Sequence, residues 1–275
     1  MKSNMQENME KSTLDAIEER LDAVQDILPE VSSLLRELQE EDLNIRTKSN
    51  DMDLVTRADH ASEEKIVGII KRRFGGDAIL AEESGVHSQD QDSPFQWLID
   101  PVDGTINYAH GLPLYGVSIG LMYRGLPFAG LVAFPALYDV YRAVQGRGAT
   151  KNGKPISVSG EDQLSRSLIA TGFPYNRAEI LPRLMQGVEA VLKNARGIRR
   201  TGSASLDLCW MAEGRLDGLY ELNLSPWDTC AGSVVVREAG GRVSDFTGEE
   251  HHPETRSIVA TNKRIHDALL AILPR

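Results

Sequence analysis

The sequence predicts a mixed α/β protein in which sheets are layered with helices. Strand-type segments follow one another from Gly116 to Gly153, separated by turn residues, whereas strand-type and helix-type segments alternate after that stretch. A regular βα barrel would not contain such a run of strands, so a layered arrangement fits better. The second observation is a helical apolar stripe that precedes all of these strands.

The stripe runs from Leu14 to Leu38, with apolar residues alternately three and four apart and acidic residues between them. Pro29 interrupts it, which predicts one helix or a kinked pair packed on its own domain. A coiled coil is the alternative, although the stripe spans only about four heptads.

The predicted elements follow in chain order. In the first half we expect a short strand or turn at Met52–Thr56, a helix at Ala61–Phe74, buried strands at Ala78–Ala81 and Trp97–Ile99, a polar loop at Gly85–Pro94, and then the strand meander. In the second half we expect strands at Ser167–Thr171, Ile198–Thr201, Gly218–Glu221, Arg242–Phe246 and Ser257–Ala260, and helices at Glu179–Ala195, Ser205–Ala212, Thr229–Ala239 and Lys263–Leu273.

The length of 275 residues allows one large domain or two packed ones. A boundary near Gly153 to Glu161 predicts an N-terminal half, 1–155, and a C-terminal half, 156–275, with the active site between them. Hydrophobic residues make up 41% and charged residues 25% of the chain, which is typical of a globular protein.

The charge balance bears on partners and location. The net charge of −10 disfavours binding to nucleic acid or to an anionic membrane. No apolar run approaches the roughly 20 residues that cross a bilayer, and the polar N-terminus is unlike a signal peptide, so we expect a cytoplasmic protein. Cys209 and Cys230 lack zinc-site spacing and are expected to be reduced core residues.

Carboxylates cluster where apolar strands end. The strand at Trp97–Ile99 leads directly into Asp100 and Asp103, with Pro101 restraining the first acid and Gly104 allowing a close turn. Asp100, Asp103 and the Val102 carbonyl could therefore converge on one hard cation.

Two further segments repeat this theme. Glu82 and Glu83 follow the strand Ala78–Ala81, and Asp228 stands at the predicted start of a helix. Taken singly, each has an ordinary explanation: a solvated turn for the glutamates, a helix N-cap for Asp228 and turn formation for Asp100 and Asp103. Together they indicate a bound cation, because apolar strands rarely end in so many acids without one.

The residue types in the acidic segments indicate which metal ion and which reaction are favoured. Histidine is absent from the three acidic segments, and oxygen ligands favour Mg²⁺ or Mn²⁺, which in turn predicts a phosphate ligand. No Walker A loop, kinase glycine loop or dinucleotide fingerprint is present, so hydrolysis is favoured over nucleotide-driven transfer.

Four motifs follow one another along the chain: Asp53–Asp59 (DLVTRAD), Ala81–Ser84 (AEES), Asp100–Tyr108 (DPVDGTINY) and Trp227–Gly232 (WDTCAG). In this order they resemble the signatures of the inositol monophosphatase family, and the match spans nearly the whole chain after residue 48. The departures at Ala81, Tyr108 and Cys230 remove no ligand. The resemblance implies a layered α-β-α-β-α sandwich of the inositol monophosphatase/fructose-1,6-bisphosphatase type, a homodimer, and Mg²⁺-dependent hydrolysis that is inhibited by Li⁺.

The resemblance also implies roles for individual residues. Glu82, Asp100 and the Val102 carbonyl match the ligands of a first metal, and Asp100, Asp103 and Asp228 those of a second, with two or three Mg²⁺ ions per site. Asp59 and Thr105 match the pair that positions water. The backbone N–H groups of Gly104 and Thr105, at the start of a helix, would receive the phosphate. The positions that match contacts to the alcohol are Gly202, Ser203, the Ala204 N–H and Glu221.

Some residues keep a second interpretation. Ser203 or Ser205 also fits a helix N-cap, which holds alongside any substrate contact. Arg199 and Arg200 could touch a second phosphate or lie in solvent, and solvent is the favoured interpretation. The segment Thr171–Tyr175 also resembles a family segment, with an expected structural role.

The predicted function is hydrolysis of a phosphate monoester of a small polyol by metal-activated water, since no Ser, Cys or His within the motifs is arranged as a nucleophile. Myo-inositol monophosphate is the favoured substrate. The alternatives are fructose 1,6-bisphosphate, histidinol phosphate and nucleotide 3′-phosphates. A different class, an interaction protein with a structural metal and a partner-binding N-terminal helix, also fits the acids.

Overall fold

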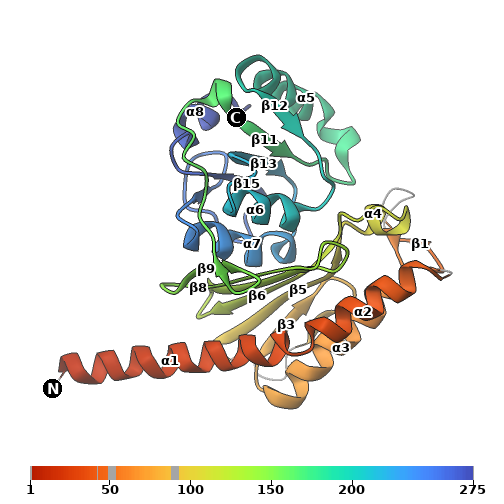
Figure 1. Ribbon diagram of the computed structural model, residues 1–275, viewed down its shortest axis with the longest axis vertical. Coiled ribbons are helices and arrows are strands. Elements are labelled where there is room, and N and C mark those ends of the chain that lie inside the picture. The colour runs from red at the N-terminus through yellow and green to blue at the C-terminus, as the bar shows by residue number, and fades with distance from the viewer. Residues whose placement is uncertain (1, 42, 49–53, 88–92, 275) are drawn as a thin grey trace.

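The computed structural model describes residues 2–41, 43–48, 54–87 and 93–274, which form five layers (Figure 1). Helices α1–α3 cover one face of an eight-stranded sheet, and α6 and α7 lie between that sheet and a five-stranded one. Helices α5 and α8 cover the outer face of the second sheet. The predicted layered α-β-α-β-α sandwich is therefore confirmed.

The N-terminal stripe forms two helices, α1 (Lys2–Gln25) and α2 (Leu28–Gln39), as the kinked-pair interpretation predicts. Pro29 lies in the first turn of α2, where its missing N–H costs no hydrogen bond. The stripe residues Ile17, Leu21 and Val31 are buried within the chain's own core rather than left free for a coiled coil.

The first sheet has the strand order β10-β9-β8-β7-β6-β5-β3-β4. All neighbouring strands are antiparallel except β3 and β5, which run parallel. The bounds are β3 Ala78–Ala81, β4 Gly85–His87, β5 Phe95–Asp103, β6 Gly116–Tyr123, β7 Leu126–Phe134, β8 Asp139–Val144, β9 Gly148–Lys151 and β10 Lys154–Pro155. The predicted meander from Gly116 onward is confirmed.

The remaining elements of the first half differ from prediction in detail. A separate ribbon pairs β1 (Arg46–Thr47) with β2 (Leu54–Val55), and α3 spans Arg57–Arg73. The predicted loop at Gly85–Pro94 begins with strand β4, which pairs with β3, and residues 88–92 lie outside the described residues. Met52 and Asp53 of the predicted Met52–Thr56 strand also lie outside them.

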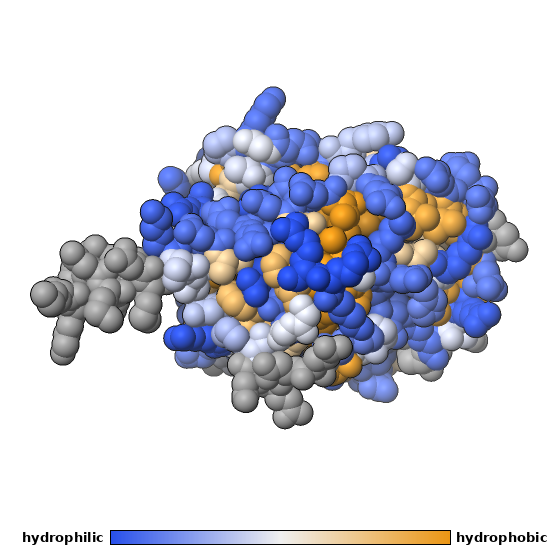
Figure 2. All heavy atoms as spheres, turned by 90° about the horizontal axis from the view of Figure 1, so that it is seen from below, coloured by the Kyte–Doolittle hydropathy of each residue, from blue (hydrophilic) through white to orange (hydrophobic). Residues whose placement is uncertain are grey.

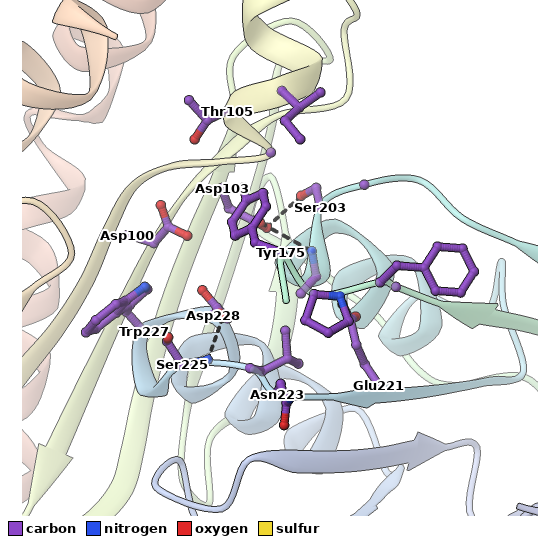
Figure 3. Close-up of a pocket in the computed structure, with 18 of the residues that line it drawn as sticks. Asp100, Asp103, Thr105, Tyr175, Ser203, Glu221, Asn223, Ser225, Trp227 and Asp228 are labelled. Atoms are coloured by element: carbon purple, nitrogen blue, oxygen red, sulfur yellow. Dashed lines mark hydrogen bonds between the residues drawn. The ribbon is translucent and has the colours of Figure 1, made fainter. Parts of the chain in front are cut away.

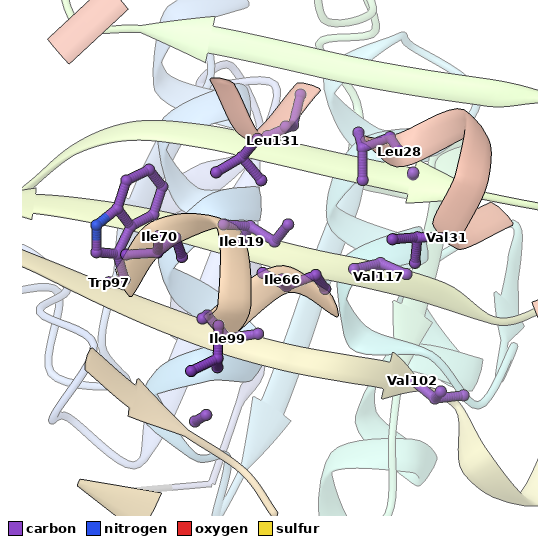
Figure 4. Packing of buried hydrophobic residues seen from close by; sticks show 14 of the residues in the cluster. Leu28, Val31, Ile66, Ile70, Trp97, Ile99, Val102, Val117, Ile119 and Leu131 are labelled. Carbon is purple, nitrogen blue, oxygen red and sulfur yellow. The ribbon is translucent and has the colours of Figure 1, made fainter. Parts of the chain in front are cut away.

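The core of this half lies between the sheet and α1–α3. Side chains of Leu28 and Val31 from α2 and of Ile66 and Ile70 from α3 face those of the strands (Figure 4). The labelled strand residues are Trp97, Ile99, Val102, Val117, Ile119 and Leu131. Burial of β5 on both faces accounts for the apolar run in its sequence that leads into Asp100.

The second sheet has the order β12-β11-β13-β15-β14. Its strands are β11 Leu168–Thr171, β12 Gly197–Arg199, β13 Gly218–Leu222, β14 Arg242–Ser244 and β15 Ser257–Thr261. The helices are α4 Thr105–Ala109, α5 Arg177–Asn194, α6 Ala204–Ala212, α7 Pro226–Glu238 and α8 His266–Ile272, with a 3₁₀ turn at Leu164–Arg166. Each predicted strand and helix of this half is present. Helix α4 belongs to the first half and begins at Thr105, where the resemblance implies a helix start.

Helix α7 lies unusually close to the first sheet because two strands offer glycines to it. A Cβ on Gly120 would lie 2.5 Å from the Cys230 sulfur, and one on Gly130 would lie 2.4 Å from the Ala231 carbonyl oxygen. These distances leave no room for a side chain. The two predicted halves therefore share the layer of α6 and α7, and the start of α7 is brought to the end of β5.

The surface is mainly polar on the face shown in Figure 2, the outer side of α1–α3, where hydrophilic residues surround smaller apolar patches. None of the helices in the described part of the chain is both long and apolar enough to cross a membrane. Cys209 and Cys230 are buried free thiols, as predicted.

Candidate active site

A cavity of about 330 Å³ opens where the end of β5, the starts of α4, α6 and α7, and the end of β13 meet (Figure 3). Its wall includes the predicted site residues Glu82, Asp100, Val102, Asp103, Gly104, Thr105, Gly202, Ser203, Ala204, Glu221 and Asp228. Of the predicted site residues, Asp59 alone is absent from the wall, and it lies directly behind Thr105.

An irregularity at the end of β5 sets the direction of its acids. Asp100 pairs with Ser118 and Asp103 with Gly116, so β5 carries one residue more than β6 across this interval. Such a bulge bends a strand and redirects its side chains. Gly104 then adopts φ 89° and begins α4, a conformation that favours glycine.

Asp100 and Asp228 meet across the cavity, one from β5 and one from α7 (Figure 3). Burial, followed by the charges of Glu82 and Asp103, raises the pKa of each carboxyl well above its usual range. In water each would be ionised, so their convergence is unfavourable unless a cation neutralises them.

Asp228 is not the N-cap residue of α7, contrary to the simpler interpretation of the sequence, but the N3 acid of its capping box. The N-cap is Ser225, and Asp228 is the third residue of the helix, where its carboxylate accepts a hydrogen bond of 2.7 Å from the Ser225 N–H. Ser118 Oγ donates to the Trp227 carbonyl at 3.0 Å and so ties the start of α7 to β6. These contacts fix Asp228 at the edge of the cavity.

Asp103 is bound to the start of α6. Its Oδ2 accepts hydrogen bonds from Ser203 Oγ at 2.6 Å, from the Ser205 N–H at 2.7 Å and from the Ser205 hydroxyl, whereas the Ala204 N–H lies 3.3 Å from Oδ1. Ser203 is also the N-cap of α6, as expected. Because Oδ1 has only the one long hydrogen bond, it retains capacity for a further ligand.

Glu82 shares a lysine with Glu83, a contact that the sequence did not indicate. Lys48 Nζ lies 2.8 Å from Glu82 Oε1 and also contacts Glu83. Burial raises the pKa of Glu83 to about 7, with Lys48 opposing the shift. A lone lysine in a polar segment carries no signal of this role, since the pairing depends on the fold.

Thr105 and Asp59 are in contact, as the resemblance implies. Thr105 Oγ1 lies 3.3 Å from Asp59 Oδ1 and 2.9 Å from the Val102 carbonyl oxygen. Asp59 Oδ2 accepts from the N–H of Thr56 at 2.8 Å and from its hydroxyl at 2.7 Å, which completes a capping box at the start of α3. Burial raises the pKa of Asp59, so a base is held in a dry position beside the cavity.

The far end of the cavity carries Glu221 from β13 and Asp207 from α6. Burial, with Asp207 and Asp103 nearby, raises the pKa of Glu221 to about 8. Glu221 needs a glycine beside it, because a Cβ on Gly172 would lie 1.8 Å from its Oε1. Asp207 was not predicted, and its Oδ1 is buried without a hydrogen-bond partner.

The segment Thr171–Tyr175, expected to be structural, contributes to the wall as well. Gly172, Phe173, Pro174 and Tyr175 line the cavity. Tyr175 is labelled in Figure 3 in front of Asp103, between the carboxylates and the Glu221 end. The structural interpretation of this segment was therefore too narrow.

The donor set fits Mg²⁺. Within the described residues no group of three or more acidic, His or Cys side chains is arranged to hold an ion as it stands, and Lys48 and the start of α6 engage Glu82 and Asp103. The cavity nevertheless offers carboxylate oxygens from three elements and the Val102 carbonyl, without nitrogen or sulfur donors among them. Oxygen ligands and mutually repelling buried carboxyls favour a hard divalent cation.

Comparison with known proteins agrees with this arrangement. The profile of the inositol monophosphatase family matches residues 16–275. An inositol-1-monophosphatase from Synechocystis sp. is 45% identical over 87% of this chain and 82% of its own. The Nus factor SuhB from Pseudomonas aeruginosa is 37% identical over 87% of this chain and 90% of its own.

Solved structures share the fold. An inositol monophosphatase from Anabaena (Nostoc) sp. superposes with a TM-score of 0.85 at 38% identity, covering 94% of this chain and 98% of that one. An IMPase/NADP phosphatase complexed with Mg²⁺ and phosphate has a TM-score of 0.81 at 21% identity, covering 94% and 95%, and at that identity it supports the fold alone. This chain therefore belongs to the inositol monophosphatase family and is an inositol monophosphatase-like phosphomonoesterase.

Proposed function

We propose that the protein hydrolyses the phosphate monoester of a small polyol with the help of Mg²⁺, and that myo-inositol monophosphate is its favoured substrate. The observation that carries this proposal is the convergence of the buried carboxyls of Asp100 and Asp228 beside the Thr105–Asp59 pair. The carboxyls that a bound cation would neutralise thus lie beside the Thr105–Asp59 pair, which can hold a water molecule.

The ligands follow from the donor set. Glu82, Asp100 and the Val102 carbonyl would hold one Mg²⁺, and Asp100, Asp103 and Asp228 a second, with a third ion as an extension of the same proposal. Bound Mg²⁺ would polarise the phosphoryl oxygens and lower the pKa of water. Lys48 would release Glu82 when the first ion binds, since Glu83 remains as a partner for its ammonium group.

The protein's own groups then act on water and phosphate. Thr105 Oγ1 accepts a hydrogen bond from the attacking water while donating to Asp59 Oδ1, its neighbour at 3.3 Å. Asp59 keeps this orientation because Thr56 fixes its other oxygen. The N–H groups of Gly104 and Thr105 would receive the phosphate as the new bond forms and the bond to the alcohol breaks.

The alcohol would lie toward Glu221. Glu221 accepts no hydrogen bond from another side chain within the described residues, and its carboxyl lines the cavity together with Gly202, Ser203 and Ala204. A carboxyl and nearby backbone N–H groups suit a polyol that offers several hydroxyls. Fructose 1,6-bisphosphate, histidinol phosphate and nucleotide 3′-phosphates remain alternative substrates of the same chemistry.

The oligomer and its location belong to this proposal as well. We infer a cytoplasmic homodimer that binds neither nucleic acid nor membrane, from the net charge of −10 and the family resemblance. Several relatives carry the name Nus factor SuhB, among them the Pseudomonas aeruginosa protein. An interaction role is therefore the second candidate, and the cavity acids would then bind a structural metal.

A phosphatase screen separates these candidates. Release of inorganic phosphate is measured from inositol, sugar, histidinol and nucleotide phosphates, with Mg²⁺ or with EDTA. Mg²⁺-dependent release that is fastest with inositol phosphate is expected, and Li⁺ at millimolar concentration should inhibit it, with Na⁺ as the ionic control. Absence of release from every ester would leave the interaction role.

A further inference from the structure

A cationic side chain at the cavity forms no ion pair with an acid of the described residues. Among the described residues that line the cavity, the cationic side chains are those of Lys48 and Arg200. Lys48 is paired with Glu82 and Glu83. The Arg200 guanidinium, by contrast, forms no ion pair or hydrogen bond with any part of the chain that the structure describes.

The position of Arg200 is set by its backbone and by a glycine. Its Nη1 lies against Gly202, where an added Cβ would come within 2.7 Å of it. Gly202 has φ 91°, and the preceding Thr201 carbonyl accepts a hydrogen bond of 2.8 Å from Asn107 Nδ2 on α4. The guanidinium therefore lies close to the start of α6, where the alcohol of the substrate would lie.

The neighbouring Arg199 behaves differently, although its chemistry is identical. Its Nη1 donates to the Ile198 carbonyl at 2.9 Å, its side chain is exposed, and it does not line the cavity. Successive residues at the end of a strand point to opposite sides, which accounts for the difference. Both arginines are exposed, as the solvent interpretation expects, but only Arg200 also lines the cavity.

The acids nearest to Arg200 do not cancel its charge. Arg200 lies within electrostatic range of Asp207 and Glu221, yet burial raises the pKa of Asp207 well above its usual range and that of Glu221 to about 8. At neutral pH Glu221 therefore favours the protonated form, and burial shifts the pKa of Asp207 in the same direction. These two acids therefore balance the charge of Arg200 only in part.

A guanidinium presents paired N–H donors that match the oxygens of a phosphate or a carboxylate. We propose that Arg200 determines specificity by receiving a second anionic group carried by the alcohol part of the substrate. This inference rests on the proposed phosphatase function and extends its substrate class to polyol bisphosphates and to phosphate esters of hydroxy acids.

The test uses two pairs of substrates that differ in one group. Fructose 1,6-bisphosphate is compared with fructose 1-phosphate, and 3-phosphoglycerate with glycerol 3-phosphate, so that the second anion is a phosphate in one pair and a carboxylate in the other. The kcat/KM ratio within each pair is measured for the full-length wild type, Arg200→Ala, Arg200→Lys and the matched control Arg199→Ala, all with Mg²⁺.

In Arg200→Ala the ratio should fall roughly 10- to 100-fold in at least one pair, as expected for the loss of a charge-assisted hydrogen bond, mainly through KM. The pair that responds identifies the anion. Arg200→Lys should recover part of the ratio, Arg199→Ala should keep it, and added salt should reduce the wild-type ratio because Arg200 is exposed.

Two results would overturn the inference: ratios in Arg200→Ala that equal those of the wild type in both pairs, or an equal fall in Arg199→Ala. Hydrolysis of fructose 1-phosphate and glycerol 3-phosphate, which carry the scissile phosphate as their single anionic group, tests the underlying phosphatase separately. If neither is hydrolysed, the proposed function fails, whereas normal hydrolysis with unchanged ratios refutes the role of Arg200 alone.

Discussion

Individual acids in the cavity are held in positions that are unfavourable without a cation. Asp100 is buried and its pKa is raised by burial and by Glu82, Asp103 and Asp228. The same crowding of buried carboxyls that destabilises the metal-free protein would favour metal binding. The proposed function and the local instability therefore have the same cause.

Asp100→Asn tests this at a single residue. Activity should fall at least about 100-fold because an amide lacks the charge that would hold both proposed ions, while the melting temperature should stay level or rise as one buried charge is removed. Phosphate release over a Mg²⁺ titration and calorimetry measure the two effects. Asp162→Asn, at an exposed position, controls for the change in net charge. Near-normal activity at ordinary Mg²⁺ concentration would contradict the ligand assignment.

Glu221→Gln should act on the alcohol rather than on the phosphate. The kcat/KM ratio between inositol phosphate and a simple ester such as glycerol 3-phosphate is expected to change, because the carboxyl faces the alcohol end of the cavity. Glu249→Gln, on the exposed surface, is the matched control. An equal loss on every ester would show that Glu221 has no part in discrimination.

Close packing between helices and strands brings these residues together. Helix α7 approaches β6 and β7 at Gly120 and Gly130, and this approach places Asp228 opposite Asp100. The position of Asp228 in the cavity therefore depends on how closely α7 packs against the first sheet.

Gly130→Ala tests that link. Its Cβ would meet the Ala231 carbonyl oxygen at 2.4 Å, so α7 must shift. We expect a loss of about 1 to 3 kcal/mol in the free energy of unfolding together with reduced activity as Asp228 moves. Urea denaturation and steady-state kinetics measure the two. Gly160→Ala is the control, because nothing lies within 4 Å of its added Cβ. If both variants behave alike, the packing argument is wrong.

The sequence was most informative about the helices and strands. The strand that ends at Asp100 was predictable because β5 is buried on both faces and leads directly into polar residues. Five residues are too few for a periodic pattern, so only the family resemblance implied the helix start at Gly104 and Thr105. The ion pairs of Lys48 and the place of Asp207 in the cavity wall were missed because they depend on segments far apart in the chain, which periodicity and spacing do not register.

At the scale of the whole molecule, the cavity is lined by residues from both sheets and from the layer of α6 and α7. Figure 1 shows that layer between the two sheets. The family resemblance implied the metal ligands but not what stabilises their arrangement without metal. In the structure, Lys48 pairs with Glu82, and hydrogen bonds from the start of α6 bind Asp103.

The stability of the metal-free protein should depend on pH through the buried acids. The pKa of Glu221 in the folded protein, about 8, exceeds its ordinary value of 4.5, so the folded state binds more protons in this window. Stability should therefore fall as pH rises from about 5 to about 8. Mg²⁺ at 100 times its Kd should add about 2.7 kcal/mol.

Calorimetry from pH 5 to pH 8, with EDTA or with Mg²⁺, measures both effects. Glu221→Gln should flatten part of the fall, because an amide does not titrate. A melting temperature that rises with pH in EDTA, or that ignores Mg²⁺, would be incompatible with a site built from protonated acids and completed by a cation.

The central claim is that the chain hydrolyses a phosphate monoester by direct attack of water held at Thr105 and Asp59. Single-turnover hydrolysis of myo-inositol 1-phosphate in H₂¹⁸O with saturating Mg²⁺ tests it, with mass analysis of the released phosphate, the inositol and the protein. We predict one ¹⁸O in the phosphate, none in the inositol, and an unmodified protein. Labelled inositol, a phosphorylated protein, or no phosphate release would contradict the account.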